Sequence, residues 1–284
     1  MDRYESMFAA LRERGEGAFV PFVMVGDPSA ELSEEVIEAL IAGGADALEL
    51  GVPFSDPVAD GPTIQRAHIR AQEAGAALTD CLGVVARVRQ RHPETPIGML
   101  IYGNVPFAVG LGPFYARCAE AGIDSVLLPD VPVRESPAFS AAAARAGIAP
   151  VYIAPPSAAP HTLDAVAGAS RGYVYAVSRV GVTGAEQAAS TAGLAESVAR
   201  LRAGAAAPVM LGFGISRPEQ VAEAIAAGAD GAISGSATVQ IVESHAPAIA
   251  QAPPGSRARE EAVEAMRAEL RGFVAAMKAA TRPR

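Results

Sequence analysis

The sequence is poor in the residues that build disulfide, zinc and nucleic-acid sites. Its 284 residues include two cysteines, four histidines and no tryptophan. Cys81 and Cys118 lie far apart with no CxxC pair, so we expect neither a structural disulfide nor a zinc site, and a reducing compartment. Lys278 is the only lysine, and the net charge of −8 comes without a block of like charges. A basic patch for nucleic acid is therefore not expected.

Long hydrophobic runs are missing as well. Residues 1–8 lack the apolar stretch of a signal peptide, and no stretch of about 18 residues is free of charged and turn residues. We therefore expect a cytoplasmic chain without a membrane partner. Hydrophobic residues nevertheless make up 50% of the sequence, which is enough for a sizeable core.

A short unit recurs along the chain. A predicted helix ends at a glycine, the residue favoured past a helix C-terminus, and an apolar strand begins two or three residues later. The copies are Ala42-Gly43-Gly44-Ala45-Asp46, Ala121-Gly122-Ile123-Asp124, Ala146-Gly147-Ile148-Ala149 and Ala227-Gly228-Ala229-Asp230. The apolar pattern predicts eight strands, at 18–25, 47–50, 97–102, 125–128, 149–153, 172–177, 208–212 and 231–234.

Helical patterns separate these strands. They are predicted at 30–42, 62–74, 78–91, 111–121, 134–146, 160–167, 191–203, 217–227 and 236–249. Eight strand–helix repeats in about 250 residues predict a (β/α)8 TIM barrel, an α/β fold. An open doubly wound sheet is the alternative, although no Gly-x-Gly-x-x-Gly follows the first strand. We expect one domain over 1–284, with an extra N-terminal helix at 1–14, a core of about 15–249, a linker or insertion at 250–259 and an amphipathic C-terminal helix at 260–280.

The stretch from Leu48 to Pro62 contains the most informative carboxylates. Glu49 stands between two leucines in a predicted strand, where burying it is costly unless it is paired or used. Asp60 lies in the following loop, which proline and glycine stiffen. Together they suggest acid/base chemistry. The alternatives are a structural strand carboxylate for Glu49 and a turn or helix cap for Asp60.

Three consecutive strands end in glycine-rich loops with hydroxyl groups. These loops are Ser178–Gln187, Gly212–Ser216 and Ser234–Ala237, and the last two lead directly into helices. Main-chain N–H groups and helix N-termini there favour an anion, so we expect a phosphate site, with plain strand-to-helix turns as the alternative. The four histidines, His68, His92, His161 and His245, fall in helices or at their ends rather than at strand ends. Neither a metal site nor a catalytic triad is expected from them.

These residues resemble those of the tryptophan synthase α subunit family. The resemblance rests first on the unbroken segment Leu48–Gln65, and it extends over nearly all of residues 1–249 before it fades in 250–259. Supporting segments are Gly26-Asp27-Pro28, Asp130-Val131-Pro132, Ser178-Arg179, Gly181-Val182-Thr183-Gly184, Gly212-Phe213-Gly214-Ile215 and Ser234-Gly235-Ser236. The family cleaves indole-3-glycerol phosphate to indole and D-glyceraldehyde 3-phosphate in a retro-aldol step.

The resemblance implies a role for each site residue. Glu49 would be the general acid/base, and Asp60 would bind the indole N–H. The phosphate would be held by Gly184, Gly214, Gly235 and Ser236, and Thr183 would also bind the substrate. The indole and glycerol pocket would be lined by Phe22, Leu100, Leu127, Tyr175, Phe213 and Ile233. No metal and no cofactor would be needed in this chain.

The resemblance also implies a partner, a β subunit that carries pyridoxal phosphate and forms an α2β2 complex with the chain. Two positions depart from the family pattern: Val105 stands where proline usually follows Asn104, and Val180 stands where a small or polar residue is common. The first departure affects a loop at the partner face, to which Asp56 is also assigned. Three hypotheses stay open: a subunit active within a complex, a lyase active alone, and a non-catalytic binder of a phosphate ester that regulates a partner.

Overall fold

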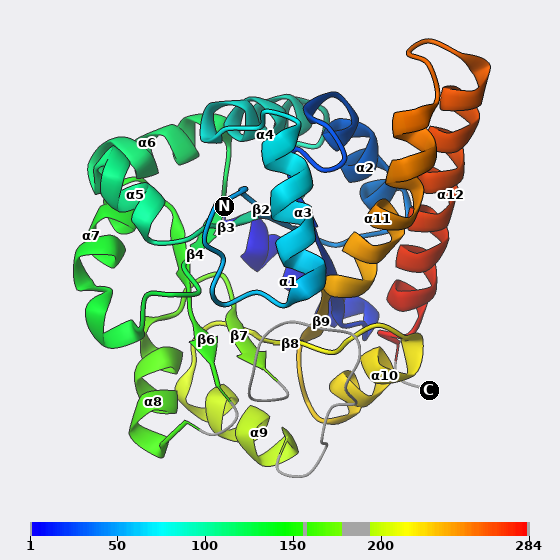
Figure 1. Cartoon of the computed structure of the whole chain (residues 1–284). Helices are drawn as coiled ribbons and strands as arrows, with labels where there is room; N and C mark the ends of the chain where they lie inside the picture. Colours follow the sequence, from blue (N-terminus) through cyan, green and yellow to red (C-terminus); the bar gives the residue numbers. More distant parts are fainter. Residues whose placement is uncertain (1, 156–157, 178–193, 283–284) are drawn as a thin grey trace.

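Strands and helices form two concentric rings in the computed structural model, which describes residues 2–155, 158–177 and 194–282 (Figure 1). Within these residues nine parallel strands form one sheet, in the order β5-β4-β3-β2-β1-β9-β8-β7-β6. Their bounds are β1 Ala18–Met24, β2 Leu48–Gly51, β3 Ile97–Leu100, β4 Ser125–Leu127, β5 Ala149–Val151, β6 Ile153–Ala154, β7 Val174–Val177, β8 Val209–Gly212 and β9 Gly231–Ser234.

The sheet closes into a barrel through the chain itself. β5 pairs with β4, β6 pairs with β7, and only Tyr152 separates β5 from β6. The Tyr152 carbonyl accepts a hydrogen bond from the Tyr175 N–H at 3.0 Å. The predicted strand 149–153 is therefore a single barrel strand that changes partner at Tyr152. All eight predicted strand positions are occupied, and the (β/α)8 barrel prediction is confirmed.

The helices surround the barrel. Their bounds are α1 Arg3–Arg14, α2 Ala30–Ala42, α3 Pro62–Glu73, α4 Leu78–Arg91, α5 Asn104–Val109, α6 Leu111–Ala121, α7 Pro137–Arg145, α8 Pro160–Ala169, α9 Leu194–Gly204, α10 Pro218–Ala226, α11 Ser236–Gln251 and α12 Arg257–Ala279, with a 3₁₀ turn at Val133–Glu135. The extra N-terminal helix and the extended C-terminal helix are both present. α11 runs further than expected, so the predicted 250–259 linker shortens to 252–256, and α12 packs back against α11 and α2 (Figure 1).

Two predictions needed correction. The segment after β3, which we expected to be a loop, forms the short helix α5. Pro106 is compatible with this helix because it stands in the first turn, where N–H groups have no intrahelical acceptor. The predicted helix 134–146 is divided into the 3₁₀ turn and α7, which begins at Pro137. Residues 191–193 of the predicted helix 191–203 lie outside the described residues.

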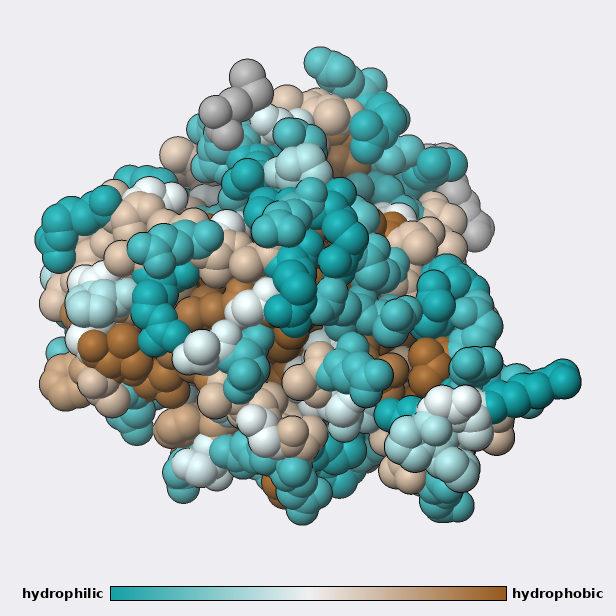
Figure 2. All heavy atoms as spheres, turned by 90° about the horizontal axis from the view of Figure 1, so that it is seen from above, coloured by the Kyte–Doolittle hydropathy of each residue, from teal (hydrophilic) through white to brown (hydrophobic). Residues whose placement is uncertain are grey.

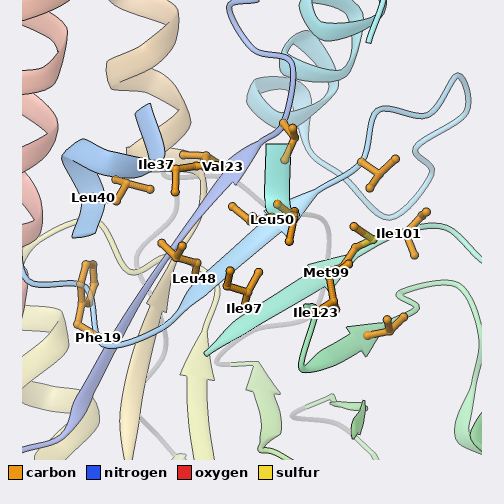
Figure 3. Packing of buried hydrophobic residues seen from close by; sticks show 14 of the residues in the cluster. Phe19, Val23, Ile37, Leu40, Leu48, Leu50, Ile97, Met99, Ile101 and Ile123 are labelled. Carbon is orange, nitrogen blue, oxygen red and sulfur yellow. The ribbon is translucent and has the colours of Figure 1, made fainter. Parts of the chain in front are cut away.

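Side chains of each strand alternate between the barrel interior and the surrounding helices. Leu48 and Leu50 of β2 pack in the layer between barrel and helices, together with Phe19, Val23, Ile97 and Met99 (Figure 3). A second cluster fills the interior and includes Val20, Leu127, Tyr175, Met210 and Ile233. Glu49, which lies between the two leucines, therefore points into the barrel.

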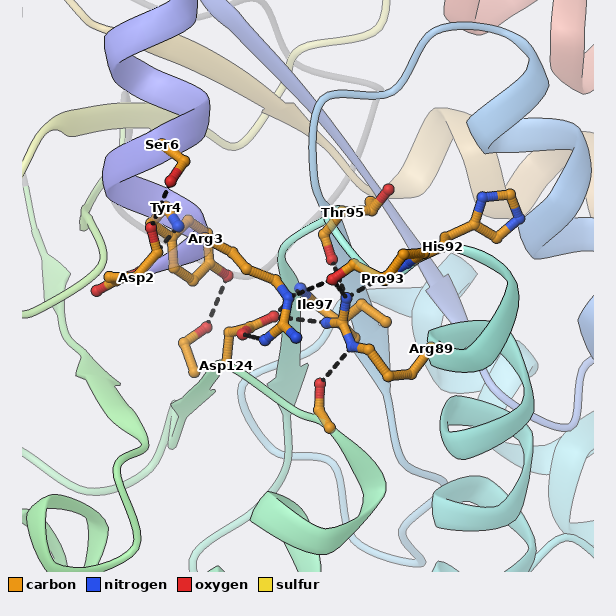
Figure 4. Close-up of polar contacts among 12 residues, drawn as sticks. Asp2, Arg3, Tyr4, Ser6, Arg89, His92, Pro93, Thr95, Ile97 and Asp124 are labelled. Carbon is orange, nitrogen blue, oxygen red and sulfur yellow. Dashed lines mark hydrogen bonds and ion pairs between the residues drawn. The ribbon is translucent and has the colours of Figure 1, made fainter.

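Helix α1 covers the amino ends of the strands. The Tyr4 and Ser125 hydroxyl groups are hydrogen bonded at 2.8 Å, and the Asp124 carboxylate accepts from Arg3 and Arg89, each at 2.7 Å (Figure 4). Gly98 makes room for this arrangement, because a Cβ atom there would lie 3.1 Å from the Tyr4 oxygen. The carboxyl ends of the strands are left for a site, as is usual in such barrels.

The surface is largely hydrophilic, with smaller hydrophobic areas between the polar residues on the face shown in Figure 2. Among the described residues, the large hydrophobic side chains that are exposed are Val58, Ile69 and Phe107. No described helix combines the length and hydrophobicity needed to cross a bilayer.

Candidate active site

Glu49 is held inside the barrel by its strand. Its backbone is in register with Phe22 of β1 and Gly98 of β3, and its side chain is 2% exposed. The Tyr173 hydroxyl donates a hydrogen bond to Glu49 Oε1 at 2.9 Å. Tyr173 is itself fixed by an edge-to-face contact with Tyr4, with ring centroids 5.5 Å apart. The carboxyl group therefore occupies a rigid, nearly dry position.

This environment changes the acidity of Glu49. Burial raises the pKa of its carboxyl group from the ordinary 4.5 to about 7; the charge of Asp60 also raises it, and the Tyr173 hydrogen bond lowers it. A carboxyl group with a pKa near 7 can both give and take a proton at neutral pH, the property required of a general acid/base. Tyr173 satisfies the carboxylate, as the structural alternative requires, and the raised pKa is also what a proton-transferring group needs.

Glu49→Gln should therefore remove a pH-dependent part of the stability. Because the Glu49 pKa is raised in the folded chain, the folded state keeps a proton that the unfolded state releases between about pH 4.5 and pH 7. The stabilisation that the protonated Glu49 gives the folded state is complete at the acidic end of this range, and it is lost as the pH rises through 7. Relative to the variant, wild type should lose about 3 kcal/mol of unfolding free energy between about pH 4.5 and about pH 8, measured by urea titration. If the unfolding free energies of wild type and Glu49→Gln differed by the same amount at both pH values, Glu49 would not hold a buried proton.

Asp60 lies at the end of the loop that follows β2, and it is 6% exposed. The Tyr102 hydroxyl donates to Asp60 Oδ2 at 2.7 Å, and His68 Nε2 lies 3.2 Å from the same oxygen. Gln65 donates to the Asp60 carbonyl at 2.8 Å. The cap position of α3 belongs to Gly61, which has no side-chain cap, so Asp60 does not act as the helix cap considered above.

The six residues predicted to line a pocket lie together in the barrel. Leu127, Tyr175 and Ile233 share the interior cluster, Leu100 and Phe213 pack against it, and Phe22 packs with Leu100 in the adjoining cluster. Tyr175 occupies the space beside Gly212, where a Cβ atom would come within 2.3 Å of its hydroxyl oxygen. Burial and the charges of Glu49 and Asp60 raise the pKa of the Tyr175 hydroxyl group.

The candidate phosphate residues follow two neighbouring strands, β8 and β9. Phe213 and Gly214 have consecutive positive φ angles of 67° and 75°, so the loop after β8 turns sharply. Gly235 is the cap residue of α11 and Ser236 is its first residue. The N-terminus of this 16-residue helix is thus presented at the carboxyl end of β9. Thr183 and Gly184 lie outside the described residues, and the phosphate assignment stays a prediction.

Three side chains that contact the two carboxylates were not predicted from the sequence. Tyr173 and Tyr102 contact the two carboxylates from distant strands or loops, and His68 contacts Asp60 from α3. A signal for His68 was available, because it falls on the buried stripe of α3 with Ile64, Ala67 and Ala71. A polar ring at helical spacing within an apolar stripe indicates a buried partner. In the described part of the chain, His, Cys, Asp and Glu side chains form no group of three or more that could hold a metal ion.

Fold and site define a class. A (β/α)8 barrel with two buried carboxylates at the carboxyl ends of its strands, one of them with a raised pKa, has the arrangement expected of an enzyme that transfers protons. The tryptophan synthase alpha chain family model matches residues 8–271. The chain belongs to the tryptophan synthase alpha chain family.

Individual relatives are similar to this chain over nearly its full length. A tryptophan synthase alpha chain from Corynebacterium efficiens is 56% identical over 282 residues, which are 99% of each chain. One from Aliivibrio fischeri is 52% identical over 281 residues, again 99% of each chain. Among solved structures, a Mycobacterium tuberculosis tryptophan synthase chain is 30% identical with a TM-score of 0.84, covering 99% of this chain and 98% of that one.

Proposed function

We propose that the chain cleaves indole-3-glycerol phosphate to indole and D-glyceraldehyde 3-phosphate, with Glu49 and Asp60 as its two working carboxylates. Membership of the family makes it a carbon–carbon lyase of tryptophan biosynthesis. The observation that carries the assignment of residues is the buried Glu49, whose pKa is raised to about 7 beside Asp60. Burying two carboxylates close enough for Asp60 to raise the pKa of Glu49 is costly, and a catalytic role for the pair accounts for that cost.

Glu49 makes both proton transfers. Its protonated form donates to C3 of the indole ring, which turns the ring into an indolenine cation and weakens the bond to the side chain. The resulting carboxylate takes the proton of the adjacent glycerol hydroxyl. As that oxygen becomes the aldehyde carbonyl, the carbon–carbon bond breaks and its electron pair restores the aromatic ring. One carboxyl group thus gives and regains one proton per turnover, which a pKa near 7 permits.

Asp60 stabilises the charge on the ring. The indole nitrogen becomes positive when C3 is protonated, and a carboxylate that accepts its N–H lowers the energy of that state. His68 and Tyr102, the described side chains that bond to the Asp60 carboxylate, both reach Oδ2, and we assign Oδ1 to the substrate.

The remaining site residues bind and orient the substrate. The apolar lining of Phe22, Leu100, Leu127, Tyr175, Phe213 and Ile233 suits a flat indole ring. Gly214, Gly235 and Ser236 would hold the phosphate at the ends of β8 and β9, with Gly184 from the preceding loop, and Thr183 of that loop would also bind the substrate. The reaction needs no cofactor in this chain, because Glu49 supplies both proton transfers.

The proposal is tested by product stoichiometry. The purified chain given indole-3-glycerol phosphate should form indole and glyceraldehyde 3-phosphate in equal amounts, the aldehyde being followed with a coupled dehydrogenase. Indole formed without the aldehyde would contradict a retro-aldol step.

An alpha chain implies a beta-subunit partner. We propose an α2β2 complex in the cytoplasm, in which the β subunit carries pyridoxal phosphate and receives the indole. Two exposed apolar side chains support a contact at the carboxyl ends of the strands: Val58 in the loop after β2, and Phe107 in α5 after β3, which are 76% and 75% exposed.

Adding the β subunit should raise the rate of indole release. The partner would contact the loop after β2 and helix α5, where Val58 and Phe107 are exposed, and favour a closed site that excludes water. Phe107→Ser should reduce this activation at a fixed β-subunit concentration and leave the isolated chain unchanged, as measured by indole release during a β-subunit titration. An isolated chain that is already at its maximal rate would favour the stand-alone lyase instead.

A further inference from the structure

His68 is a buried polar ring that the cleavage chemistry does not use directly. Its side chain is 2% exposed, on the inner stripe of α3, and its ring meets the Tyr102 ring edge to face at a centroid distance of 6.2 Å. A polar ring in such a position has to satisfy two nitrogen atoms. Both ring nitrogens, Nδ1 and Nε2, have hydrogen-bond partners in the structure.

The hydrogen bonds of His68 fix its tautomer. The Phe54 main-chain N–H donates to Nδ1 at 2.9 Å, so Nδ1 is an acceptor and carries no proton. The ring proton is then on Nε2, which lies 3.2 Å from Asp60 Oδ2 and donates to it. His68 therefore connects the main chain of the loop after β2 to the carboxylate at the end of that loop.

Tyr102 reinforces the same carboxylate oxygen. Its hydroxyl donates to Asp60 Oδ2 at 2.7 Å and accepts the Ala59 N–H at 3.0 Å. Its ring stacks on Phe54, with centroids 5.1 Å apart and an interplanar angle of 19°. Two donors therefore converge on one oxygen of Asp60, and each is held in turn by the main chain of the same loop.

We propose that His68 is a positioning residue for Asp60. With Tyr102 it fixes the rotation of the carboxylate, so that Oδ2 is occupied and Oδ1 is turned to the indole N–H. It also transmits the conformation of the loop at Phe54 to the carboxylate. The inference rests on the proposed function, because it assigns to Asp60 the substrate N–H as its partner. A purely structural role would leave catalysis through Asp60 unaffected.

Two substitutions separate the donor from the acceptor of His68. In His68→Asn, the amide oxygen can still accept the Phe54 N–H, but the shorter side chain no longer donates to Asp60. In His68→Gln, the amide nitrogen reaches the place of Nε2 and restores the donor. We expect kcat for indole release to fall about 10- to 100-fold in the Asn variant, with KM little changed, and to stay within about threefold of wild type in the Gln variant.

A double-mutant cycle tests whether His68 acts through Asp60. In an Asp60→Asn background, His68→Asn should cost less than about threefold, because the carboxylate that it orients is already gone. His245→Asn serves as the control. His245 bonds to Glu269 on α12, in an exposed contact, and the variant should therefore have wild-type kcat.

The outcomes are distinct. A wild-type chain without indole release overturns the proposed function. An active wild type overturns the positioning role if the Asn variant is as fast as the Gln variant, or if His68→Asn costs the same factor in both backgrounds. Should the Asn variant fail to fold, the Gln variant decides alone, and a loss of more than about 10-fold in that variant would overturn the inference.

Discussion

Glu49→Gln should lower the rate of indole release by at least about 1,000-fold, because the amide can neither protonate C3 nor take the hydroxyl proton. The substitution keeps the size of the side chain, and Gln can still accept the Tyr173 hydrogen bond that Glu49 now accepts at 2.9 Å. The fold should therefore be preserved while the chemistry is lost. Steady-state kinetics on the purified variant measure this effect.

Substrate binding distinguishes lost chemistry from a damaged site. Indole-3-propanol phosphate, which lacks the glycerol hydroxyls and cannot be cleaved, should bind the variant within about threefold of its affinity for wild type. Glu73→Gln is a matched control, since Glu73 is exposed on α3 and should have the wild-type rate. Near-wild-type turnover by Glu49→Gln would refute the assigned mechanism.

Asp60→Asn is expected to lower kcat by about 100- to 1,000-fold, the size of effect seen when a group that stabilises transition-state charge is lost. Its amide oxygen can accept from both His68 and Tyr102, which now donate to Oδ2. The loop should accordingly keep its conformation, and the missing element is the negative charge opposite the ring nitrogen. The loss should appear in kcat more than in KM, because the positive charge develops only as C3 is protonated.

The control for this prediction is a carboxylate remote from the barrel interior. Asp164→Asn alters an exposed residue of α8 that pairs with Arg200, and its kcat should be unchanged. If Asp60→Asn retained wild-type kcat, the ring nitrogen would need no carboxylate, and the division of labour between Glu49 and Asp60 would be wrong.

The barrel could be predicted because its signals are local. Glycines past the helix ends and unbroken apolar runs mark each strand, and these patterns depend on neighbouring residues only. The division of the fifth strand at Tyr152 could not be predicted, since it arises where the chain changes partner from β4 to β7. Helix α5 gave no apolar stripe, because it spans only Asn104–Val109.

Glu49 and Asp60 could be singled out since a carboxylate in an apolar strand and one on a proline-rich loop are unusual in themselves. The hydrogen-bond partners of these two carboxylates could not be predicted from the sequence. Tyr173 is 124 residues from Glu49, and Tyr102 is 42 residues from Asp60; only the closed barrel brings them together. His68 is close in sequence, but its role depends on the Phe54 N–H, whose direction is set by the folded loop.

Indole release by the purified wild-type chain, with and without a β subunit, tests the account most directly. Indole-3-glycerol phosphate should yield indole in both cases, and faster with the partner present. A folded chain that binds the phosphate ester but releases no indole under either condition would contradict it and favour a non-catalytic binder.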